Sequence, residues 1–526
     1  MGMYLSIGNG NFQSALNEEY VDKSLIIAEF NKRIDKKSKL VCISRPRRFG
    51  KSMMAQMLCA YYDKTCDSHK LFAELKIVND ESYEKYLNKY PVIYLDITWF
   101  VSNCGDIENI VKYIQDEVSK EIKNEYPKTY GNSLPEVIAR ASLEYKEKFV
   151  IIIDEWDAIF REAKNNEKLQ KEYVMLLRGL FKSPMTDNMF SLAFMTGILP
   201  IKKYGTQSAM TDFWEYSMLD PDAFAPYTGF TEEEVKALCK EHDMDFEKAK
   251  KWYDGYSFED GLSIYNPNSI MKCMQSKKYR NFWARTESFE SLRFYIDMDF
   301  EGIKQSLLQM VAGESCKIDT LSFQNDITSI NSKDDVFTLL VHFGYLTYNS
   351  ENKTVRIPNE EIRDEFKTSV KNGTHIELAK LIKESDYLLE CTLEGKEAEV
   401  AAAIETAHDA GTAPLFYNNE QALRSIIKFA YISAVDDYVQ IQELPSGKGY
   451  ADVVFIPKKT SDKPAMVIEL KWNKEADTAI KQIKENNYPQ LIKNLSGDIV
   501  LVGINYDEKS KKHECKIERF RKQGVV

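Results

Sequence analysis

Runs of apolar residues alternate along the first 200 positions with segments in which apolar residues recur at helical spacing. The continuous apolar runs, of the kind that form strands buried on both faces, cover residues 40–43, 91–98, 149–153 and 190–195. Helical spacing lies between them, over residues 106–125, 133–147 and 166–183. Strands that alternate with helices predict an α/β domain with a parallel sheet, whose ligands bind at the carboxyl ends of the strands.

The first apolar run leads into a short polar loop and then into a helix rich in Met, Leu and Ala. The loop ends in Gly50-Lys51-Ser52, and strand, loop and helix in this order are typical of a phosphate-binding loop. Backbone N–H groups would hold the phosphates, Lys51 would reach the β- and γ-phosphates, and the Ser52 hydroxyl would ligate Mg²⁺. Gly50 allows the backbone to approach the phosphates closely.

The rest of this loop is stiff and basic. Its residues Arg47, Arg48 and Phe49 are expected to contact the nucleotide. The usual pattern G-x-x-x-x-G-K-[ST] has a first glycine where this chain has Arg45. Since a lone Gly-Lys-Ser is found at many strand-to-helix turns, the prediction of nucleotide binding needs a second motif.

The second motif is the apolar run at 149–153, which ends in Asp154 and Glu155. Asp154 is expected to assist the Mg²⁺, and Glu155, directly after it, to polarise an attacking water. Thr196 ends the next apolar run, where it would sense the γ-phosphate or orient a water; the alternative is an ordinary threonine at a strand end. The two motifs in this order predict the binding of ATP with Mg²⁺.

Aromatic-rich helical patterns follow over residues 200–330 and indicate a helical lid. Residues 334–368 then show the order helix, strand, turn, strand and helix, which predicts a winged-helix-like unit. Contact with nucleic acid and a packing role are both open for this unit. The segment 370–412 is the candidate boundary, so we expect domains at residues 1–200, 201–375 and 376–526.

A second group of charged residues lies near the C-terminus. Glu420 begins an amphipathic helical pattern, Asp452 lies early in one apolar run, and Glu469 and Lys471 lie in the next. If the turn between these runs is centred between residues 460 and 461, Asp452 falls opposite Glu469 across an antiparallel pair, about 5 Å away. Lys471 points to the same face as Glu469, since side chains alternate along a strand.

Two carboxylates side by side among apolar residues would cost several kcal/mol if they were buried without compensation. A divalent cation supplies that compensation, and oxygen ligands suit Mg²⁺ or Mn²⁺. Asp452, Glu469 and Glu420 are therefore candidate metal ligands, with Lys471 left to activate a water or to stabilise charge at a phosphorus centre. The alternative is a solvated hairpin edge with ordinary charges.

Composition narrows the class of protein. A hydrophobic content of 44% and an aromatic content of 12% exclude a disordered chain, and 526 residues suggest about three domains. No apolar run approaches a membrane span, no signal peptide is recognisable, and nine scattered cysteines suit a reducing, cytoplasmic setting. With a net charge of −11, contact with nucleic acid needs a local basic patch, for which Lys474, Lys481 and Lys484 are candidates.

Taken together, the segments ISRPRRFGKS, VIIIDEWD, FMTGI, GYADVVF and VIELKW resemble those of the AAA-ATPase-like family that carries a C-terminal PD-(D/E)xK nuclease-superfamily domain. The resemblance implies a P-loop NTPase sheet followed by a restriction-endonuclease-like α/β domain. It implies Glu155, Asp452, Glu469 and Lys471 as catalytic residues. It also implies Glu420 as the acid on the helix and Gln482 as a fourth motif residue, with Ala451 in place of the proline.

The expected function is that of a cytoplasmic ATPase whose nucleotide state gates a C-terminal nuclease that uses Mg²⁺ or Mn²⁺. Its expected partners are a nucleotide and nucleic acid, with DNA favoured over RNA, and no membrane. One alternative is a nucleotide-switched binding or scaffold protein whose nuclease fold does not cleave. Another is a signalling NTPase that forms a homo-oligomer through residues 200–330.

Overall fold

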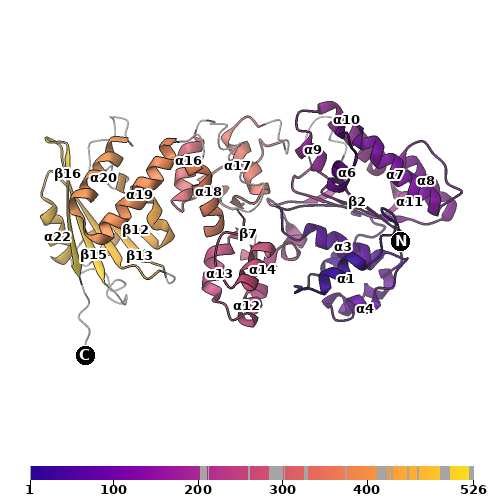
Figure 1. Cartoon of the computed structure of the whole chain (residues 1–526), viewed down its shortest axis with the longest axis horizontal. Coiled ribbons are helices and arrows are strands. Elements are labelled where there is room, and N and C mark those ends of the chain that lie inside the picture. Colours follow the sequence, from indigo (N-terminus) through magenta and orange to yellow (C-terminus); the bar gives the residue numbers. More distant parts are fainter. Residues whose placement is uncertain are drawn as a thin grey trace. The chain divides into compact units, whose positions relative to one another are not determined.

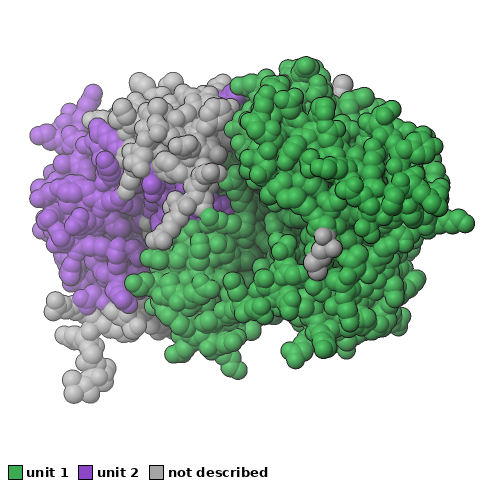
Figure 2. Space-filling view, turned by 45° about the vertical axis from the view of Figure 1, so that its right-hand side comes forward, with its two compact units in different colours: residues 1–282, 316–359 green, residues 283–315, 360–526 purple. Residues whose placement is uncertain are grey.

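The computed structural model describes residues 2–201, 210, 212–258, 261–283, 300, 302–324, 330–372, 376–410, 423, 426–427, 430–446, 449–458, 461–485 and 498–520. The chain divides into two compact units, which Figure 2 shows in different colours. Unit 1 comprises residues 1–282 and 316–359, and unit 2 comprises residues 283–315 and 360–526. The division into three domains at the boundaries given above stays a prediction.

Unit 1 is built on a five-stranded parallel sheet in the order β2-β3-β4-β1-β5. Its strands are β1 (Leu40–Ser44), β2 (Val92–Asp96), β3 (Phe149–Asp154), β4 (Phe190–Gly197) and β5 (Trp214–Tyr216). Every residue of β1, β3 and β4 is buried, which explains why their sequences are continuously apolar. Because β4 lies between β1 and β3, the carboxyl ends of these strands meet at one edge of the sheet.

Helices cover both faces of this sheet (Figure 1). One face packs against α1 (Gly10–Leu16), α2 (Ile26–Asn31), α3 (Lys51–Tyr62), α4 (His69–Phe72), η1 (Lys76–Asn79) and α5 (Tyr83–Tyr86). The other packs against α6 (Ile97–Asn103), α7 (Ile110–Glu125), α8 (Leu134–Tyr145), α9 (Ala158–Glu162), α10 (Glu167–Phe181) and α11 (Thr186–Met189). The expected α/β architecture, with a parallel sheet between helices, is confirmed.

The rest of unit 1 holds two small antiparallel sheets. The first, in the order β6-β8-β7, consists of β6 (Phe230–Thr231), β7 (Tyr256–Ser257) and β8 (Ser263–Tyr265), with η4 (Asp222–Tyr227), α12 (Glu232–Glu241), α13 (Phe246–Tyr253) and α14 (Pro267–Ser276) nearby in the chain. The second, in the order β10-β11-β9, consists of β9 (Cys316–Lys317), β10 (Thr347–Asn349) and β11 (Thr354–Arg356), with α17 (Lys333–His342) between β9 and β10. Residues 335–342 of α17 are all buried, which favours the packing role for this winged-helix-like unit.

Unit 2 is built on a mixed five-stranded sheet in the order β12-β13-β14-β15-β16, in which β14 and β15 are parallel and the other neighbours antiparallel. Its strands are β12 (Tyr438–Ser446), β13 (Gly449–Pro457), β14 (Ala465–Trp472), β15 (Ile499–Asp507) and β16 (Lys512–Phe520). Its helices are α16 (Ile303–Val311), α18 (Glu360–Asn372), α19 (Ile376–Glu394), α20 (Glu397–Ala410), η8 (Ile432–Asp436) and α22 (Ala476–Glu485). Apolar residues of α19 and α20 pack on one face of the sheet and those of α22 on the other (Figure 1).

Three of the strands in unit 2, β12, β15 and β16, were not predicted from the sequence, although the α/β class of this unit is confirmed. The segment 370–412 is largely occupied by α19 and α20, whose apolar residues belong to the core of unit 2. In the part of the chain that the structure describes, no helix combines the length and the apolar composition needed to cross a membrane.

Candidate functional site

The phosphate-binding loop predicted after the first strand lies between β1 and α3. Gly50 precedes the first residue of α3 and has a φ of +85°, in the left-handed region that glycine adopts without strain. A β-carbon at this position would meet no atom within 4 Å, so glycine is favoured here by the backbone conformation and not by crowding. The space above the backbone is open. The N–H groups at the start of α3 are therefore available to an anion.

Lys51 is the first residue of α3, and its side chain is only 3% exposed. Its Nζ donates to the carbonyl oxygen of Pro46 at 3.1 Å and lies 3.4 Å from Oε1 of Glu155. The structure thus brings together the lysine of the first motif and the glutamate of the second. Burial would raise the pKa of Glu155, but the charges of Lys51 and Arg161 bring it below its ordinary value.

Asp154 ends β3 and is almost completely buried. Burial raises its pKa to about 6, against the lowering effect of a hydrogen bond from the Ser52 side chain. Tyr94 donates to the second carboxylate oxygen at 3.4 Å. Ser52 and Asp154, the two predicted ligands of a nucleotide-bound Mg²⁺, therefore contact each other, and their hydroxyl and carboxylate oxygens are the donors that this cation prefers.

Thr196 lies between the two motifs in the sheet, since it pairs with Ile43 of β1 on one side and with Asp154 of β3 on the other. Its side chain is buried, and its hydroxyl donates to the carbonyl oxygen of Ile43 at 2.9 Å. A role toward the γ-phosphate stays a prediction for this residue.

The basic residues of the loop differ in their surroundings. Arg47 is exposed, whereas Arg48 is half-buried, has a φ of +70°, and lies 3.5 Å from the carbonyl oxygen of Phe282 through Nη1. Phe49 is buried, and its ring meets that of Tyr256 edge-on at 5.2 Å. The loop is therefore anchored to the small sheet that contains β7, and the nucleotide contacts expected of Arg47, Arg48 and Phe49 stay predictions.

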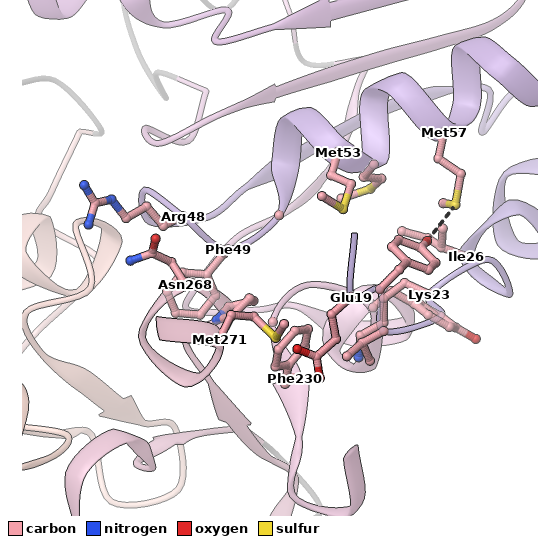
Figure 3. A pocket seen from close by; sticks show the side chains of 17 residues that line it. Glu19, Lys23, Ile26, Arg48, Phe49, Met53, Met57, Phe230, Asn268 and Met271 are labelled. Atoms are coloured by element: carbon pink, nitrogen blue, oxygen red, sulfur yellow. Dashed lines mark hydrogen bonds between the residues drawn. The ribbon is translucent and has the colours of Figure 1, made fainter. Parts of the chain in front are cut away.

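A pocket of about 340 Å³ adjoins this loop and was not predicted from the sequence. In Figure 3, Met53 and Met57 reach into it from α3, while Phe230 and Met271 line the opposite side. The hydroxyl of Tyr20 closes one wall through a contact of 3.5 Å to the sulfur of Met57. Further lining residues are Glu19, Val21, Lys23, Ile26, Arg48, Phe49, Gly50, Met54, Tyr227, Gly229, Pro267 and Asn268. The signal available in the sequence was the helical spacing of Met53, Met54 and Met57 directly after the phosphate loop.

In unit 2, the predicted register of the second site is confirmed. Val453 pairs with Ile468 and Val454 with Val467, so the next pair along β13 and β14 sets Asp452 opposite Glu469. Both carboxylates are buried. Oδ2 of Asp452 accepts a hydrogen bond of 2.8 Å from the backbone N–H of Leu470, which holds this side chain against β14.

Glu469 and Lys471 share the face of β14 that carries Val467, which packs against α22. Nζ of Lys471 lies 3.0 Å from Oε1 of Glu469, and both side chains are at most 6% exposed. Burial, together with the charge of Asp452, raises the pKa of Glu469 to about 7 despite Lys471 beside it. A single ammonium thus only partly compensates two buried carboxylates, which is the situation that a divalent cation relieves.

The other residues predicted for this site are not shown in contact with Asp452, Glu469 or Lys471. Glu420 lies outside the described residues, and Gln482 is half-buried on α22. Lys474 and Lys481 are exposed, and Lys484 is paired with Glu518 at 2.6 Å. Within the described ranges no three His, Cys, Asp or Glu side chains are arranged to hold a metal ion. Asp452 and Glu469 supply two carboxylate ligands, and their oxygens fit Mg²⁺ or Mn²⁺.

Comparison with known protein families matches two segments of the chain. Residues 6–206 match the family described as "Predicted AAA-ATPase", and residues 418–516 match the PD-(D/E)XK nuclease superfamily. The chain carries an AAA-ATPase-like segment and a PD-(D/E)XK nuclease-like segment. The resemblance inferred from the sequence is therefore confirmed. The ATPase-like segment contains Lys51, Asp154 and Glu155, and the nuclease-like segment contains Asp452, Glu469 and Lys471.

Individual relatives are distant. An uncharacterized protein from the vnfD 5' region of Azotobacter chroococcum mcd 1 is 20% identical over 492 residues, which are 89% of this chain and 90% of the relative. Among solved structures, DnaA from Aquifex aeolicus bound to AMPPCP is 10% identical, with a TM-score of 0.27, and the match covers 71% of this chain and 92% of that one. The Aeropyrum pernix ORC2 protein is 12% identical, with a TM-score of 0.29 and coverage of 67% and 96%. At these TM-scores the structural matches carry no argument about this chain.

Proposed function

We propose that this protein hydrolyses ATP in unit 1 and cleaves nucleic acid, DNA in preference to RNA, in unit 2, with the nucleotide state gating the cleavage. The observation that carries the proposal is the buried group of Asp452, Glu469 and Lys471. Burying two facing carboxylates and one lysine costs more desolvation free energy than their mutual attraction returns, and such groups are typical of functional sites. A second observation is the contact of Lys51 with Glu155 in the ATPase-like segment.

ATP would lie with its phosphates at the start of α3 and its base in the adjoining apolar pocket. The N–H groups after Gly50 and the ammonium of Lys51 would hold the phosphates. Ser52 and Asp154 would hold a Mg²⁺, which neutralises phosphate charge when bound. Glu155 would accept a proton from the attacking water while the bond between the γ-phosphorus and its bridging oxygen breaks and ADP leaves with the electron pair.

The pocket beside the loop suits the base of the nucleotide. Its volume of about 340 Å³ and its methionine, phenylalanine and tyrosine walls match the mostly apolar character of ligand pockets. Met53 is one turn from the loop on the same helix, so a base bound there would be continuous with phosphates held at Gly50. We therefore expect adenosine to add affinity beyond the triphosphate alone.

Cleavage of nucleic acid would take place at the β13–β14 pair. Asp452 and Glu469 would hold the divalent cation, which supplies positive charge at the scissile phosphate when bound. Lys471 would stabilise the charge that develops on the phosphate oxygens as a water oxygen bonds to phosphorus and the bond to the leaving sugar oxygen breaks. Lys474, shortly after β14 in the chain, and Lys481, on the helix α22 that packs on the same face, are both exposed and would bind the phosphate backbone.

A reducing, cytoplasmic location is part of the proposal. All nine cysteines are free thiols in the structure, including the buried Cys42 and Cys59. Chains in oxidising compartments usually pair their cysteines, whereas free buried thiols are ordinary in the cytoplasm.

The deciding experiment measures cleavage of labelled linear and circular DNA, and of RNA, with Mg²⁺ or Mn²⁺ and with or without ATP. We expect the wild type to cut, Lys471→Ala to be inactive, and Lys51→Ala to lose only the effect of ATP. Matched controls are Lys383→Ala, an exposed lysine of α19 in unit 2, and Lys70→Ala, an exposed lysine of unit 1. If no nucleic acid is cut with either metal while ATP still binds, the protein is a nucleotide-switched scaffold instead.

A further inference from the structure

The carboxylate of Glu155 is held from two sides by different partners. Its Oε1 lies 3.4 Å from Nζ of Lys51, and its Oε2 accepts a hydrogen bond of 2.5 Å from Nη2 of Arg161. The Glu155 side chain is 21% exposed and that of Arg161 only 11%. Oε1 is therefore paired with Lys51 at the end of the phosphate loop and Oε2 with Arg161 outside it, and the charge of Arg47 in the loop also helps to lower the pKa of this carboxyl.

Arg161 is anchored at its other end. Its Nε donates to Oδ2 of Asp157 at 3.1 Å, and Asp157 is fully buried. The same Oδ2 accepts hydrogen bonds from the backbone N–H groups of Ile198 and Leu199, at 3.3 and 3.0 Å. Arg161 thereby links Glu155 to the chain directly after β4, and the short helix α9 places it one turn beyond Asp157.

The glycine at the end of β4 shows how closely this anchor is packed. A β-carbon on Gly197 would lie 2.4 Å from Oδ1 of Asp157 and 2.8 Å from Cδ1 of Trp156. Since real contacts of this kind do not fall below about 3 Å, any larger residue would displace Asp157. The position of the Asp157 carboxylate, and through it that of Arg161, is therefore fixed by the backbone of the central sheet.

The backbone at Glu155 also needs support from its surroundings. Its φ is +49°, a left-handed conformation that is uncommon for a residue with a side chain. The N–H of Glu155 donates to the carboxylate of Asp154 at 3.0 Å, which holds the peptide. The side chain is held by Lys51 and Arg161, as described above.

We propose that Arg161 is a positioning residue that holds Oε2 of Glu155 while Oε1 orients and activates the attacking water. This inference rests on the proposed hydrolysis of ATP. In that function Lys51 must serve the β- and γ-phosphates, so its contact with Oε1 is given up when the nucleotide binds. The hydrogen bonds and ion pairs described for Arg161 go to Glu155 and Asp157, so it stays with Oε2 and keeps the carboxylate in place.

The alternative role for Arg161 is purely structural, since a buried Asp157 needs a cation whether or not Glu155 acts on water. The two roles differ in what they predict for kinetics. A positioning role lowers kcat through Glu155 and leaves ATP binding unchanged, because Arg161 contacts Glu155 and not the nucleotide itself. A structural role lowers stability, and with it ATP binding and kcat together.

The test measures steady-state ATP hydrolysis by the full chain for the wild type and for Arg161→Ala, Arg161→Lys, Glu155→Gln and the double variant Glu155→Gln/Arg161→Ala. We expect Arg161→Ala to lower kcat about 30- to 100-fold and to change KM less than about threefold. Arg161→Lys should restore part of kcat. In the Glu155→Gln background, Arg161→Ala should lower kcat less than about twofold, because its effect acts through Glu155.

Arg140→Ala is the matched control, since Arg140 forms an arginine–glutamate pair with Glu136 of 2.8 Å on the outer surface of α8. It should leave kcat and KM unchanged. Equal effects of Arg161→Ala with and without Glu155, or a rise in KM that accompanies the fall in kcat, would overturn the inference. If Arg161→Ala does not fold, Arg161→Lys is measured instead. A lysine keeps the positive charge but lacks the rigid fork of donors with which a guanidinium holds two carboxylates, so kcat should still fall while KM stays unchanged. A wild type without ATP hydrolysis would contradict the proposed function itself, whereas hydrolysis that is insensitive to Arg161 contradicts this inference alone.

Discussion

Arg45 occupies the position at which phosphate loops usually have their first glycine, and its side chain is completely buried. Its Nε donates to Oγ1 of Thr228 at 2.7 Å, and its Nη1 donates to the carbonyl oxygens of Ser44 and Tyr216 at 2.8 and 3.0 Å. Burial lowers the pKa of the guanidinium to about 9, which leaves it charged at neutral pH. The guanidinium thus joins the end of β1 to β5 and to Thr228, the residue after η4.

Restoring the glycine of the usual pattern should therefore damage the protein. Arg45→Gly removes the donors for three buried oxygens and leaves a cavity as large as the side chain, which we expect to cost about 3 kcal/mol of unfolding free energy. Urea unfolding followed by tryptophan fluorescence measures this loss, with the exposed Arg47→Gly as the control for a glycine in the same loop. Equal stability of Arg45→Gly and the wild type would show that the buried guanidinium contributes nothing.

The pKa of Glu469 predicts how metal binding depends on pH. Its pKa is raised to about 7, so the carboxyl is mostly protonated at pH 6 and must release a proton before it can ligate a cation. The affinity for Mn²⁺ should therefore be about tenfold higher at about pH 8 than at about pH 6, because the carboxyl loses its proton as the pH rises through about 7. Calorimetric titration with Mn²⁺ without nucleotide measures this. Glu469→Gln should bind weakly at both pH values, and a wild-type affinity that does not change with pH would contradict the prediction.

At the scale of elements, the position of α22 decides whether the second site closes. Gly503 of β15 lies beneath the first turns of this helix, and a β-carbon there would approach the carbonyl oxygen of Ala476 to 2.5 Å and Cβ of Ala479 to 3.0 Å. The glycine has no unusual φ, so it is required by this close approach of helix and sheet and not by its backbone conformation. The same helix covers the face of β14 that carries Glu469 and Lys471.

Gly503→Ala should therefore lift α22 from the sheet. We expect a loss of about 1–3 kcal/mol in unfolding free energy and a loss of nucleic-acid cleavage, with ATP hydrolysis unchanged. Gly10→Ala is the matched control, because a β-carbon on Gly10 in α1 meets nothing within 4 Å. Unchanged stability of Gly503→Ala would mean that the helix adjusts without a loss of free energy and that Gly503 is not needed to position α22.

At the scale of the whole molecule, charge opposes the proposed substrate. The chain has a net charge of −11, so a nucleic acid has to bind at a local basic cluster, which we expect near the second site. Lys474 and Lys481 lie there, whereas the charge of Lys484 is already paired with Glu518. Binding should therefore rest on few phosphate contacts.

The salt dependence of DNA binding measures how many contacts there are. For Glu469→Gln, used to prevent cleavage, we expect the logarithm of the affinity to fall with the logarithm of the salt concentration with a slope of about −2. The further changes Lys474→Ala and Lys481→Ala should bring the slope close to zero, while Lys70→Ala in unit 1 should leave it unchanged. Fluorescence anisotropy of labelled DNA between about 50 and 200 mM KCl provides the measurement. A steep slope that survives loss of both lysines would place the contact surface elsewhere.

The sequence alone determined which strands of unit 1 are buried and in what order the two motifs occur, because continuous apolar runs and helical spacing are local properties of the chain. It also determined the pairing of Asp452 with Glu469, since a short turn leaves one register that buries the apolar residues of both strands. It did not reveal β12, β15 or β16, whose partners are set by the order of strands in the sheet.

Tertiary structure decided the side-chain partners. Arg45 bonds to residues more than a hundred positions away, Lys51 meets Glu155 across the sheet, and the pocket beside α3 is assembled from segments as distant as Tyr20 and Met271. Arg161 was not singled out from the sequence, since an arginine one turn after an acidic motif is usually exposed. Periodicity reports which face of an element is buried, but only packing sets what lies against that face, and the chemistry of both sites depends on those contacts.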